Sequence, residues 1–188
     1  MLKRVLSYAH ELLQSSIQPG ETVIDGTCGN GKDTIVLSKL VGDSGQVLAF
    51  DVQEQAIENT KQRLAEEKIS NVKLIHDSHE NAETYLPEEV YGFVGGAIFN
   101  LGYLPGSDKS VITKPTSTIQ AVDTIVKYLK SGGLIILVVY YGHEGGEAEK
   151  NALLDHLRSF EQKNYNVLQY GFINQKNSPP FILAIEKK

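Results

Sequence analysis

Short apolar runs alternate with longer amphipathic runs along most of this chain, and this alternation constrains the fold more than any other feature. Buried β-strands are predicted at 22–25, 46–51, 72–75, 93–99 and 134–140. Amphipathic helices are predicted between them, at 32–41, 54–67, 79–85 and 116–130. Strands that alternate with helices join through right-handed crossovers into a mainly parallel sheet with helices on both faces. The sequence therefore predicts an α/β fold with a Rossmann-like, doubly wound sheet.

The two ends of the chain extend this arrangement. Residues 1–17 carry apolar side chains at helical spacing and precede a Pro-Gly pair, so this helix is expected to cover one face of the sheet. Near the other end, a helix after residue 145 is followed by apolar runs at 166–172 and 181–186, which predict a C-terminal antiparallel hairpin. Because one core can still grow at this length, residues 1–188 are expected to form a single domain.

The helix predicted at 116–130 carries the clearest local signals. Its buried stripe comprises Ile119, Val122, Ile125, Val126 and Leu129. Ser117 and Gln120 have the spacing of a capping box, and Gly132-Gly133 is expected to end the helix. Both ends of this helix are therefore predicted to be set by local sequence.

Composition and charge exclude several classes of protein. The first segment lacks the continuous apolar stretch of a signal peptide, and the longest strongly apolar run, 134–141, is too short to cross a bilayer. A cytoplasmic protein without a membrane partner is therefore expected. The single cysteine, Cys28, cannot form an internal disulfide and has no zinc-ligand spacing around it, so no metal is expected. The net charge of −5 argues against general attraction to polyanions, although a local basic patch could still bind nucleic acid.

A glycine-rich segment, 26–31, joins the first predicted strand to the helix at 32–41. In open α/β sheets, ligands bind beyond the carboxyl ends of the strands, where glycines let a ligand approach the backbone and a helix N-terminus offers free amides. Gly29 and Gly31 are the expected positions of close approach. Asp51 ends the next strand about twenty residues later, the spacing expected of a carboxylate that accepts hydrogen bonds from ribose hydroxyls. The segment therefore predicts a site for a ligand that contains adenosine.

Three interpretations of this segment compete. The glycines could make only a tight turn, with Asp51 as a solvated strand end. A nicotinamide dinucleotide would occupy the same position, but the loops of those enzymes read GxGxxG, whereas this one reads GxxGxG. Asp25, at the end of the first strand, would repel a pyrophosphate and could accept a hydrogen bond from an ammonium group or from loop amides. The charge therefore favours S-adenosylmethionine, with S-adenosylhomocysteine as the product.

Further cofactor contacts are predicted after the third strand. Asp77 could accept a hydrogen bond from the adenine amino group, or else Asp77 or Ser78 could cap the following helix. Cys28 is interpreted as a small residue in a tight turn rather than as a nucleophile, because no neighbour in the sequence would lower its pKa. The full predicted cofactor set is Asp25, Cys28, Gly29, Asn30, Gly31, Asp33, Asp51, Gln53, Asp77, Ser78, Asn100, Leu101 and Gly102.

The chain resembles class I methyltransferases, and this resemblance implies that the segment after the fourth strand, 97–106, holds the group that receives a methyl group. Methyl transfer is an in-line displacement at a sulfonium, so the enzyme must mainly hold a neutral nitrogen lone pair against the methyl carbon. The side-chain oxygen of Asn100 and the carbonyl of Leu101 could hold an amine, and Tyr103 could stack on a base. The alternative is a turn in which Asn100 caps the strand end. The segment resembles the (N/D)PPY signature of amino-methyltransferases, with Leu101-Gly102 in place of the two prolines.

Four segments in order, 25–34, 99–106, 140–146 and 177–180, resemble one bacterial family over essentially the whole chain. It is the family first labelled rRNA methylases and later associated with tRNA 5-aminomethyl-2-thiouridine methyltransferases. The resemblance implies N-methylation of the aminomethyl group on a wobble uridine, which gives 5-methylaminomethyl-2-thiouridine, with the anticodon region of tRNA as the partner. A methyltransferase that acts on rRNA or on a small-molecule amine is the alternative.

The implied acceptor is an aliphatic amine, which is largely protonated at neutral pH and must lose a proton before attack. His143 and Glu144 are candidates for that task or for binding the anticodon loop, unless they only form a polar turn after the fifth strand. His79 is a weaker second candidate, because it is expected near the adenine. The predicted catalytic set is Asn100, Tyr103 and His143.

Basic side chains on the N-terminal helix and after Asn100 could contact tRNA phosphates, or could be ordinary solvated surface. They are Lys3, Arg4, Lys109, Lys114, Lys127 and Lys130.

Two other functions compete: a nicotinamide-dependent oxidoreductase, disfavoured by the loop pattern and by the lack of a second substrate domain, and a noncatalytic S-adenosylmethionine sensor. An exposed apolar surface on the terminal hairpin could pair two copies into a homodimer.

Overall fold

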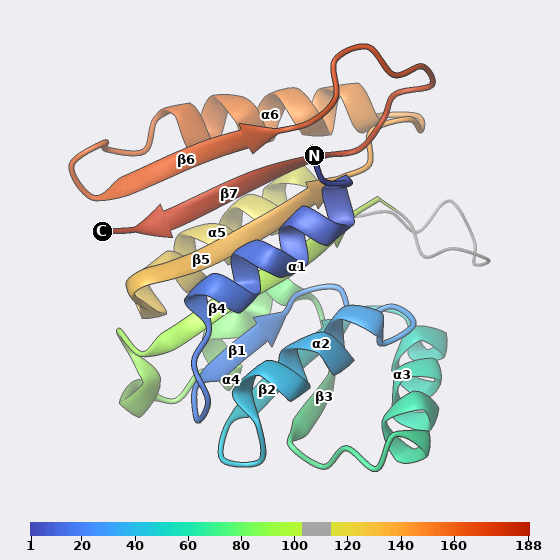
Figure 1. Ribbon diagram of the computed structural model, residues 1–188, viewed down its shortest axis with the longest axis vertical. Coiled ribbons are helices and arrows are strands. Elements are labelled where there is room, and N and C mark those ends of the chain that lie inside the picture. The colour runs from blue at the N-terminus through green and yellow to red at the C-terminus, as the bar shows by residue number, and fades with distance from the viewer. Residues whose placement is uncertain (103–113) are drawn as a thin grey trace.

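The computed structural model, which describes residues 1–102 and 114–188, contains a seven-stranded sheet in the order β3-β2-β1-β4-β5-β7-β6 (Figure 1). The strands are β1 (Thr22–Asp25), β2 (Gln46–Asp51), β3 (Val72–His76), β4 (Val94–Leu101), β5 (Leu129–Val139), β6 (Tyr165–Tyr170) and β7 (Phe181–Lys187). Strands β1 to β5 pair in parallel, whereas β7 is antiparallel to both β5 and β6. The structure confirms the predicted Rossmann-like α/β fold with antiparallel C-terminal strands.

Helices cover both faces of this sheet, as predicted (Figure 1). They are α1 (Val5–Ser16), α2 (Lys32–Val41), α3 (Glu54–Glu66), α4 (Ala82–Tyr85), α5 (Pro115–Tyr128) and α6 (Gly146–Arg158), with short 3-10 turns η1 (His79–Asn81) and η2 (Glu88–Val90). Side chains of α1 and α2 pack in one apolar cluster, and those of α5 and α6 pack in the other. Strand β5 contributes alternate residues to both, with Ile136 and Val138 in the first cluster and Ile135 and Leu137 in the second. None of the helices within the described residues is long and apolar enough to span a membrane.

The start of α5 differs from the prediction. Pro115 occupies the first turn, and Lys114 stands at the N-cap without a side-chain cap. The hydroxyl of Ser117 donates to the Lys114 carbonyl at 3.0 Å, and the amide of Gln120 donates to the Glu80 carbonyl at 3.3 Å. The predicted capping box is therefore wrong, because a proline preorganises the first turn and both side chains bond elsewhere.

The end of α5 also differs from the prediction. The helix stops at Tyr128 and β5 begins at Leu129, so Gly132-Gly133 lies inside the strand instead of ending the helix. The pairing of β5 with β4 is irregular after Val94, and Gly132 has a φ of 76°, in the left-handed region that glycine tolerates. The glycine pair therefore accommodates an irregularity in the sheet.

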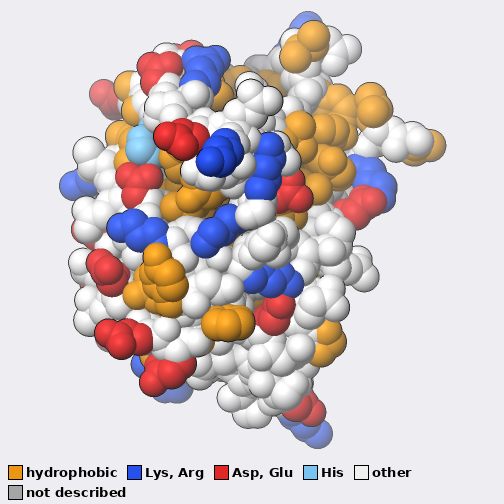
Figure 2. Space-filling model, turned by 90° about the vertical axis from the view of Figure 1, so that its left-hand side faces the viewer, with side chains coloured by type: hydrophobic (Ala, Val, Ile, Leu, Met, Phe, Trp, Pro, Cys, Tyr) orange, Lys and Arg blue, Asp and Glu red, His pale blue; other side chains and the backbone are white. Residues whose placement is uncertain are grey.

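The parallel strands begin at the amino edge of the sheet and end at its carboxyl edge, where β1, β2 and β4 finish at Asp25, Asp51 and Leu101. Figure 2 views the amino edge, on which basic and acidic side chains are interspersed. Lys127 lies at this edge, because its carbonyl accepts a hydrogen bond from the Lys187 ammonium close to the start of β5. Its predicted contact with phosphate beside a site at the carboxyl edge does not fit this position.

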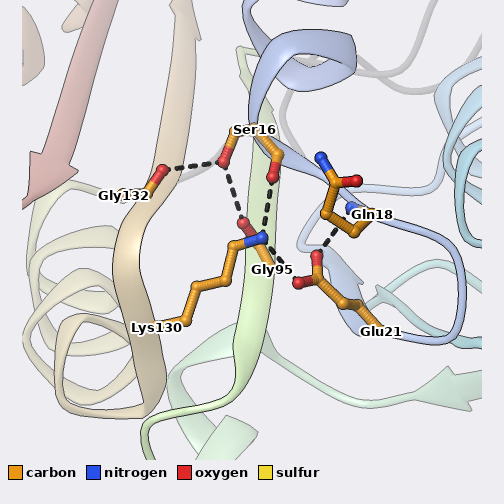
Figure 3. A network of polar contacts seen from close by, with 6 residues as sticks. All are labelled: Ser16, Gln18, Glu21, Gly95, Lys130 and Gly132. Atoms are coloured by element: carbon orange, nitrogen blue, oxygen red, sulfur yellow. Dashed lines mark hydrogen bonds and ion pairs between the residues drawn. The ribbon is translucent and has the colours of Figure 1, made fainter.

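A polar network fixes the end of α1 to the amino edge (Figure 3). The Lys130 ammonium donates to the Ser16 carbonyl at 2.8 Å and to Glu21 Oε1 at 2.5 Å. The Ser16 hydroxyl donates to the carbonyls of Gly95 and Gly132 at 3.2 and 2.9 Å. Lys130 is therefore an internal partner of α1, and this position does not fit the suggested contact with tRNA beside the site.

The remaining basic candidates are placed differently. Lys3 and Arg4 precede α1, at the carboxyl-edge end of that helix, where the Tyr170 hydroxyl donates to the Lys3 carbonyl at 2.7 Å. Lys114 is exposed in front of α5, and Lys109 lies outside the described residues. Lys3, Arg4 and Lys114 are thus the candidates near the edge that carries the predicted site.

Candidate active site

The loop between β1 and α2 needs its glycines for conformation. Gly29 and Gly31 have φ values of 52° and 79°, in the left-handed region, and Gly31 forms the N-cap of α2. A Cβ atom on Gly26 would lie 2.1 Å from the ring of Phe99, so this position excludes a side chain. The Thr60 hydroxyl donates to the Gly29 carbonyl at 3.0 Å and ties the loop to α3. The loop is thereby held at the carboxyl edge beside the N-terminus of α2.

Asp51, at the end of β2, holds the same loop from the other side. Its Oδ2 accepts a hydrogen bond from the Gly29 amide at 3.0 Å, and its Oδ1 accepts one from the Gln53 amide at 3.0 Å. A carboxylate oxygen can accept more than one hydrogen bond, so a pair of ribose hydroxyls could still donate to Asp51. The structure therefore brings together three members of the predicted cofactor set.

Asp25 is fully buried beneath the loop. Its Oδ2 accepts a hydrogen bond from the Thr34 hydroxyl at 2.6 Å, and its Oδ1 accepts one from the Thr27 amide at 3.2 Å. Burial, together with the negative charge of Asp33, raises the pKa of Asp25 from 3.8 to about 7. Of the partners predicted for this carboxylate, the structure shows the loop amide, while a threonine hydroxyl donates to the other oxygen.

Asn100 stands at the centre of a chain of polar contacts that joins several elements. Its Nδ2 donates to Asp33 Oδ2 on α2 at 2.5 Å, and its backbone amide donates to the Thr27 hydroxyl at 2.7 Å. The other oxygen of Asp33 lies 2.6 Å from His10 Nε2 on α1. Because Asp33 binds the amino group of the Asn100 side chain, the side-chain oxygen remains as a hydrogen-bond acceptor. The Asn100 side chain therefore bridges β4 to α2 instead of only capping its own strand.

Asp33 influences the ionisation of its neighbours. Its hydrogen bond to His10 raises the pKa of the imidazole above the ordinary value of 6.5. Burial, together with the charge of Asp33, raises the pKa of Tyr140, which follows β5. Asp25, Asp33 and Asp51 thus give the carboxyl edge a negative character, which suits a cationic ligand such as a sulfonium or an ammonium.

Sequence reasoning misses three residues of this site: His10, Thr27 and Tyr140. His10 lies beside the buried Ala9 of α1, and nothing in its spacing indicates that it contacts Asp33, 23 residues away. Tyr140 follows a buried strand and carries no signal beyond its position. Only Thr27 offers a signal in the sequence, namely a hydroxyl inside an otherwise glycine-rich ligand loop.

Asp77 and Ser78, which are predicted to lie on the adenine side of the site, form hydrogen bonds with residues close to them in the chain. Asp77 accepts hydrogen bonds from the Ser78 amide at 2.7 Å, the Asn81 side chain at 2.9 Å and the Tyr85 hydroxyl at 2.9 Å. The Asn81 and Tyr85 contacts lower the pKa of Asp77. The N-cap of η1 is Ser78, whose hydroxyl accepts a hydrogen bond from the Glu80 amide at 3.4 Å. Of the two predicted caps, Ser78 is therefore the one observed, and three donors hold Asp77 in place.

Cys28 and Asn30 belong to the glycine loop, and His79 lies against it. His79 Nδ1 lies 2.9 Å from the Gly26 carbonyl, and burial lowers the pKa of this imidazole. Burial raises the pKa of the Cys28 thiol, which supports its interpretation as a small residue without a nucleophilic role. Asn30 turns toward α3, where its Oδ1 accepts a hydrogen bond from the Asn59 side chain at 3.0 Å. These three side chains therefore support the loop rather than the proposed amine position.

The end of β4 approaches the loop that follows β5. Gly102 has a φ of 147°, and a Cβ atom on it would lie 3.3 Å from Tyr140 Cβ. Leu101, the residue before it, is fully buried. His143 lies farther along the loop after β5, with its Nδ1 3.0 Å from the Glu144 carbonyl. His143 thus follows β5, the strand next to β4 in the sheet, and lies at the same edge as Asn100.

Tyr103, which is predicted to stack on a base, lies outside the described residues. Within those residues, no group of three or more His, Cys, Asp or Glu side chains is arranged to hold a metal ion. The described part of the site therefore consists of the glycine loop, the three carboxylates around it and the Asn100 side chain.

Comparison with known proteins finds related proteins both by sequence and by structure. A family model described as "Putative rRNA methylase" matches residues 47–186, and a model for protein-L-isoaspartate O-methyltransferases matches residues 3–88. The chain is 35% identical, over 99% of its length, to a chloroplastic tRNA (mnm(5)s(2)U34)-methyltransferase of Arabidopsis thaliana, and it covers 70% of that protein.

Solved structures agree with these sequence matches. A crystal structure from Clostridium thermocellum described as "putative rRNA-methylase" has 41% sequence identity and a TM-score of 0.95, with 100% of both chains covered. A crystal structure from Streptococcus mutans described as "a putative methyltransferase", in complex with S-adenosylhomocysteine, has 41% identity and a TM-score of 0.91, again with 100% of both chains covered. The similarity therefore extends over the whole chain.

Proposed function

We propose that this chain, which belongs to the "Putative rRNA methylase" family, methylates the amine of 5-aminomethyl-2-thiouridine at the wobble position of tRNA. The product would be 5-methylaminomethyl-2-thiouridine. At the coarser level, the chain is an S-adenosylmethionine-dependent methyltransferase. The Arabidopsis relative supports the tRNA substrate, since its name specifies mnm(5)s(2)U34 in tRNA. A methyltransferase for rRNA or for a small-molecule amine is the alternative, and these hypotheses differ only in the molecule that accepts the methyl group.

The carboxyl edge fits S-adenosylmethionine by charge and by backbone conformation. When bound, the cofactor supplies a methyl group on a positively charged sulfur. Asp51 keeps acceptor capacity toward ribose hydroxyls, and the left-handed Gly29 and Gly31 leave the loop backbone without side chains. Asp25 and Asp33 add negative charge, which stabilises a cationic ligand and would repel a pyrophosphate. We therefore place the cofactor across this loop, between Asp51 and Asn100.

The arrangement of Asn100 is the observation that carries the proposal. Its side-chain amino group is bound to Asp33 and its backbone amide to Thr27, so the side chain is fixed with its oxygen directed as an acceptor. Holding the amine there supplies most of the rate, because displacement requires the nitrogen, the methyl carbon and the sulfur in line. Tyr103 and His143 remain proposed members of the catalytic set, the first as a stack for the base and the second as a contact with the anticodon loop.

Locating the transferred methyl group tests this function. The protein is incubated with S-adenosylmethionine labelled in its methyl group and with tRNA that lacks only the final methyl, in parallel with rRNA and with the free modified nucleoside. Nucleoside mass spectrometry should find the label in 5-methylaminomethyl-2-thiouridine from the tRNA sample. Label in rRNA, equal transfer to the free nucleoside, or no transfer at all would contradict the proposed substrate.

A further inference from the structure

The proposed reaction requires a proton acceptor. An aliphatic ammonium resembles that of lysine, with a pKa of about 10.4, so only a small fraction of the amine has a free lone pair at neutral pH. His79 lies against the Gly26 carbonyl beneath the loop, and His143 lies in the loop after β5. The polar chain through Asn100 instead leads from the proposed amine position to Asp33 and then to His10.

Asp33 contacts both Asn100, which is proposed to hold the amine, and a more exposed imidazole. One of its oxygens is 2.5 Å from Asn100 Nδ2, and the other is 2.6 Å from His10 Nε2. The side chain of Asp33 is 15% exposed, against 36% for His10, so the carboxylate is the inner member of the pair. A protonated His10 compensates the charge of Asp33, whereas a neutral His10 leaves that charge available to an ammonium.

Resting on the proposed function, we propose that Asp33 is the proton acceptor of the methylation site and that His10 is a positioning residue that controls its charge. The substrate N–H bond breaks with its electron pair left on nitrogen, and the proton moves to an Asp33 oxygen. The nitrogen pair then forms the bond to the methyl carbon while the carbon–sulfur bond breaks toward sulfur. The products are a secondary ammonium, S-adenosylhomocysteine and a proton that Asp33 returns to solvent.

Two other titratable groups face Asp33 from neighbouring elements. Asp25, at the end of β1, has a pKa of about 7, and Tyr140, after β5, has a raised pKa. Both groups are neutral when protonated and negatively charged when deprotonated. His10, in contrast, is positively charged when protonated and neutral when deprotonated. Comparing His10 variants with the wild type over one pH range therefore separates the titration of His10 from that of Asp25.

The pH profile of single-turnover methylation tests the inference, with tRNA that lacks the final methyl as substrate. The wild-type rate should rise through the pKa of His10, above 6.5, and then level off. His10→Gln keeps a donor toward Asp33 but cannot be protonated, so the rise should vanish and the rate at low pH should exceed that of the wild type. Asp33→Asn keeps an oxygen for Asn100 but removes the base. Its rate should fall about 100-fold at neutral pH and climb about tenfold per pH unit with the neutral amine.

His156 offers a matched control, because its Nε2 lies 2.7 Å from Asp123 Oδ1 in a pair that joins α6 to α5. His156→Gln should leave the pH profile unchanged. NMR titration of the His10 ring adds a readout independent of activity, since its pKa should fall in Asp33→Asn. Urea unfolding of each variant checks that the fold is intact.

Three outcomes overturn the inference and leave the proposed function standing. They are a wild-type inflection that persists in His10→Gln, an Asp33→Asn variant that keeps the wild-type profile, and a His10 pKa at or below 6.5 in the wild-type protein. If the wild-type protein transfers no methyl group to the aminomethyl tRNA, the proposed function fails instead. The NMR titration then still decides whether Asp33 and His10 are coupled.

Discussion

The amino and carboxyl edges of the sheet differ in how their charged side chains are paired. At the amino edge, Lys130 is paired with Glu21 and bonded to the end of α1, so opposite charges compensate each other (Figure 3). At the carboxyl edge, Asp25, Asp33 and Asp51 have amides, hydroxyls and one imidazole as partners, and within the described residues none forms an ion pair with lysine or arginine. The contrast indicates that the amino edge contributes stability, whereas the carboxyl edge keeps carboxylates without a lysine or arginine partner for a cationic ligand.

Asn100→Ala should show the largest effect at the carboxyl edge. It removes the group proposed to hold the amine, so the single-turnover methylation rate should fall about 100-fold. Affinity for S-adenosylhomocysteine, measured by calorimetry, should fall much less than the rate, because Asp51 and the glycine loop keep their mutual contacts. An unchanged rate would remove Asn100 from the reaction.

Lys130→Met tests the amino edge. The side chains of Lys130 and Glu21 are 22% and 18% exposed, so losing one partner should lower the free energy of unfolding by about 2 kcal/mol. Lys39→Met is the control, since its ion pair with Glu67 is 63% and 46% exposed and should contribute less than about 0.5 kcal/mol. Urea unfolding measures both variants. Equal losses of unfolding free energy in the two variants, or a reduced methylation rate per folded Lys130→Met molecule, would contradict the separate roles of the two edges.

Asp25→Asn tests the charge beneath the glycine loop through pH. A carboxyl with a pKa of 3.8 when unfolded and about 7 when folded stabilises the protein below about pH 4 and loses that contribution as the pH rises to 7. Relative to Asp25→Asn, the wild type should therefore lose up to about 1.4 kcal/mol of unfolding free energy per pH unit across this window. Urea unfolding at pH 5 and pH 7 measures the difference. Parallel behaviour of the two proteins would show that burial does not raise this pKa.

Arg4→Gln should have the smallest effect. Arg4 is exposed at the carboxyl-edge end of α1, so its loss should reduce the slope of log affinity for tRNA against log salt by about 1. Lys127→Gln, at the amino edge, should leave that slope unchanged. Filter binding over a salt series measures both slopes. Equal changes in the two variants would mean that tRNA does not discriminate between the edges.

Periodicity in the sequence predicts most of the fold. The ranges expected for β1, β2 and α2 match the structure to the residue. The two strands are predictable because buried parallel strands are continuous apolar runs with turn residues on both sides. A local signal predicts less where the residue indicates only that the backbone can adopt unusual conformations. Gly132-Gly133 suits a helix stop and a sheet irregularity equally well, and tertiary pairing with β4 selects the second.

The candidate site is predictable only in part. Asp51 and Asn100 lie at the ends of parallel strands, and these ends meet at one edge, so topology predicts that they share a site. The contact between His10 and Asp33 depends instead on how α1 packs beside α2. Periodicity identifies the buried face of a helix but not the partner of a polar side chain at its margin. The residues that tune charge at the site therefore emerge only from the tertiary structure.

The central claim is that the carboxylates of the carboxyl edge bind the cofactor. Calorimetric titration of S-adenosylhomocysteine into the wild type, Asp51→Asn and Lys130→Met tests it most directly. We expect saturable binding by the wild type and by folded Lys130→Met, and an affinity about tenfold weaker for Asp51→Asn, which loses a charged acceptor for ribose hydroxyls. Equal affinity for the wild type and Asp51→Asn, or no binding by the wild type, would contradict the account.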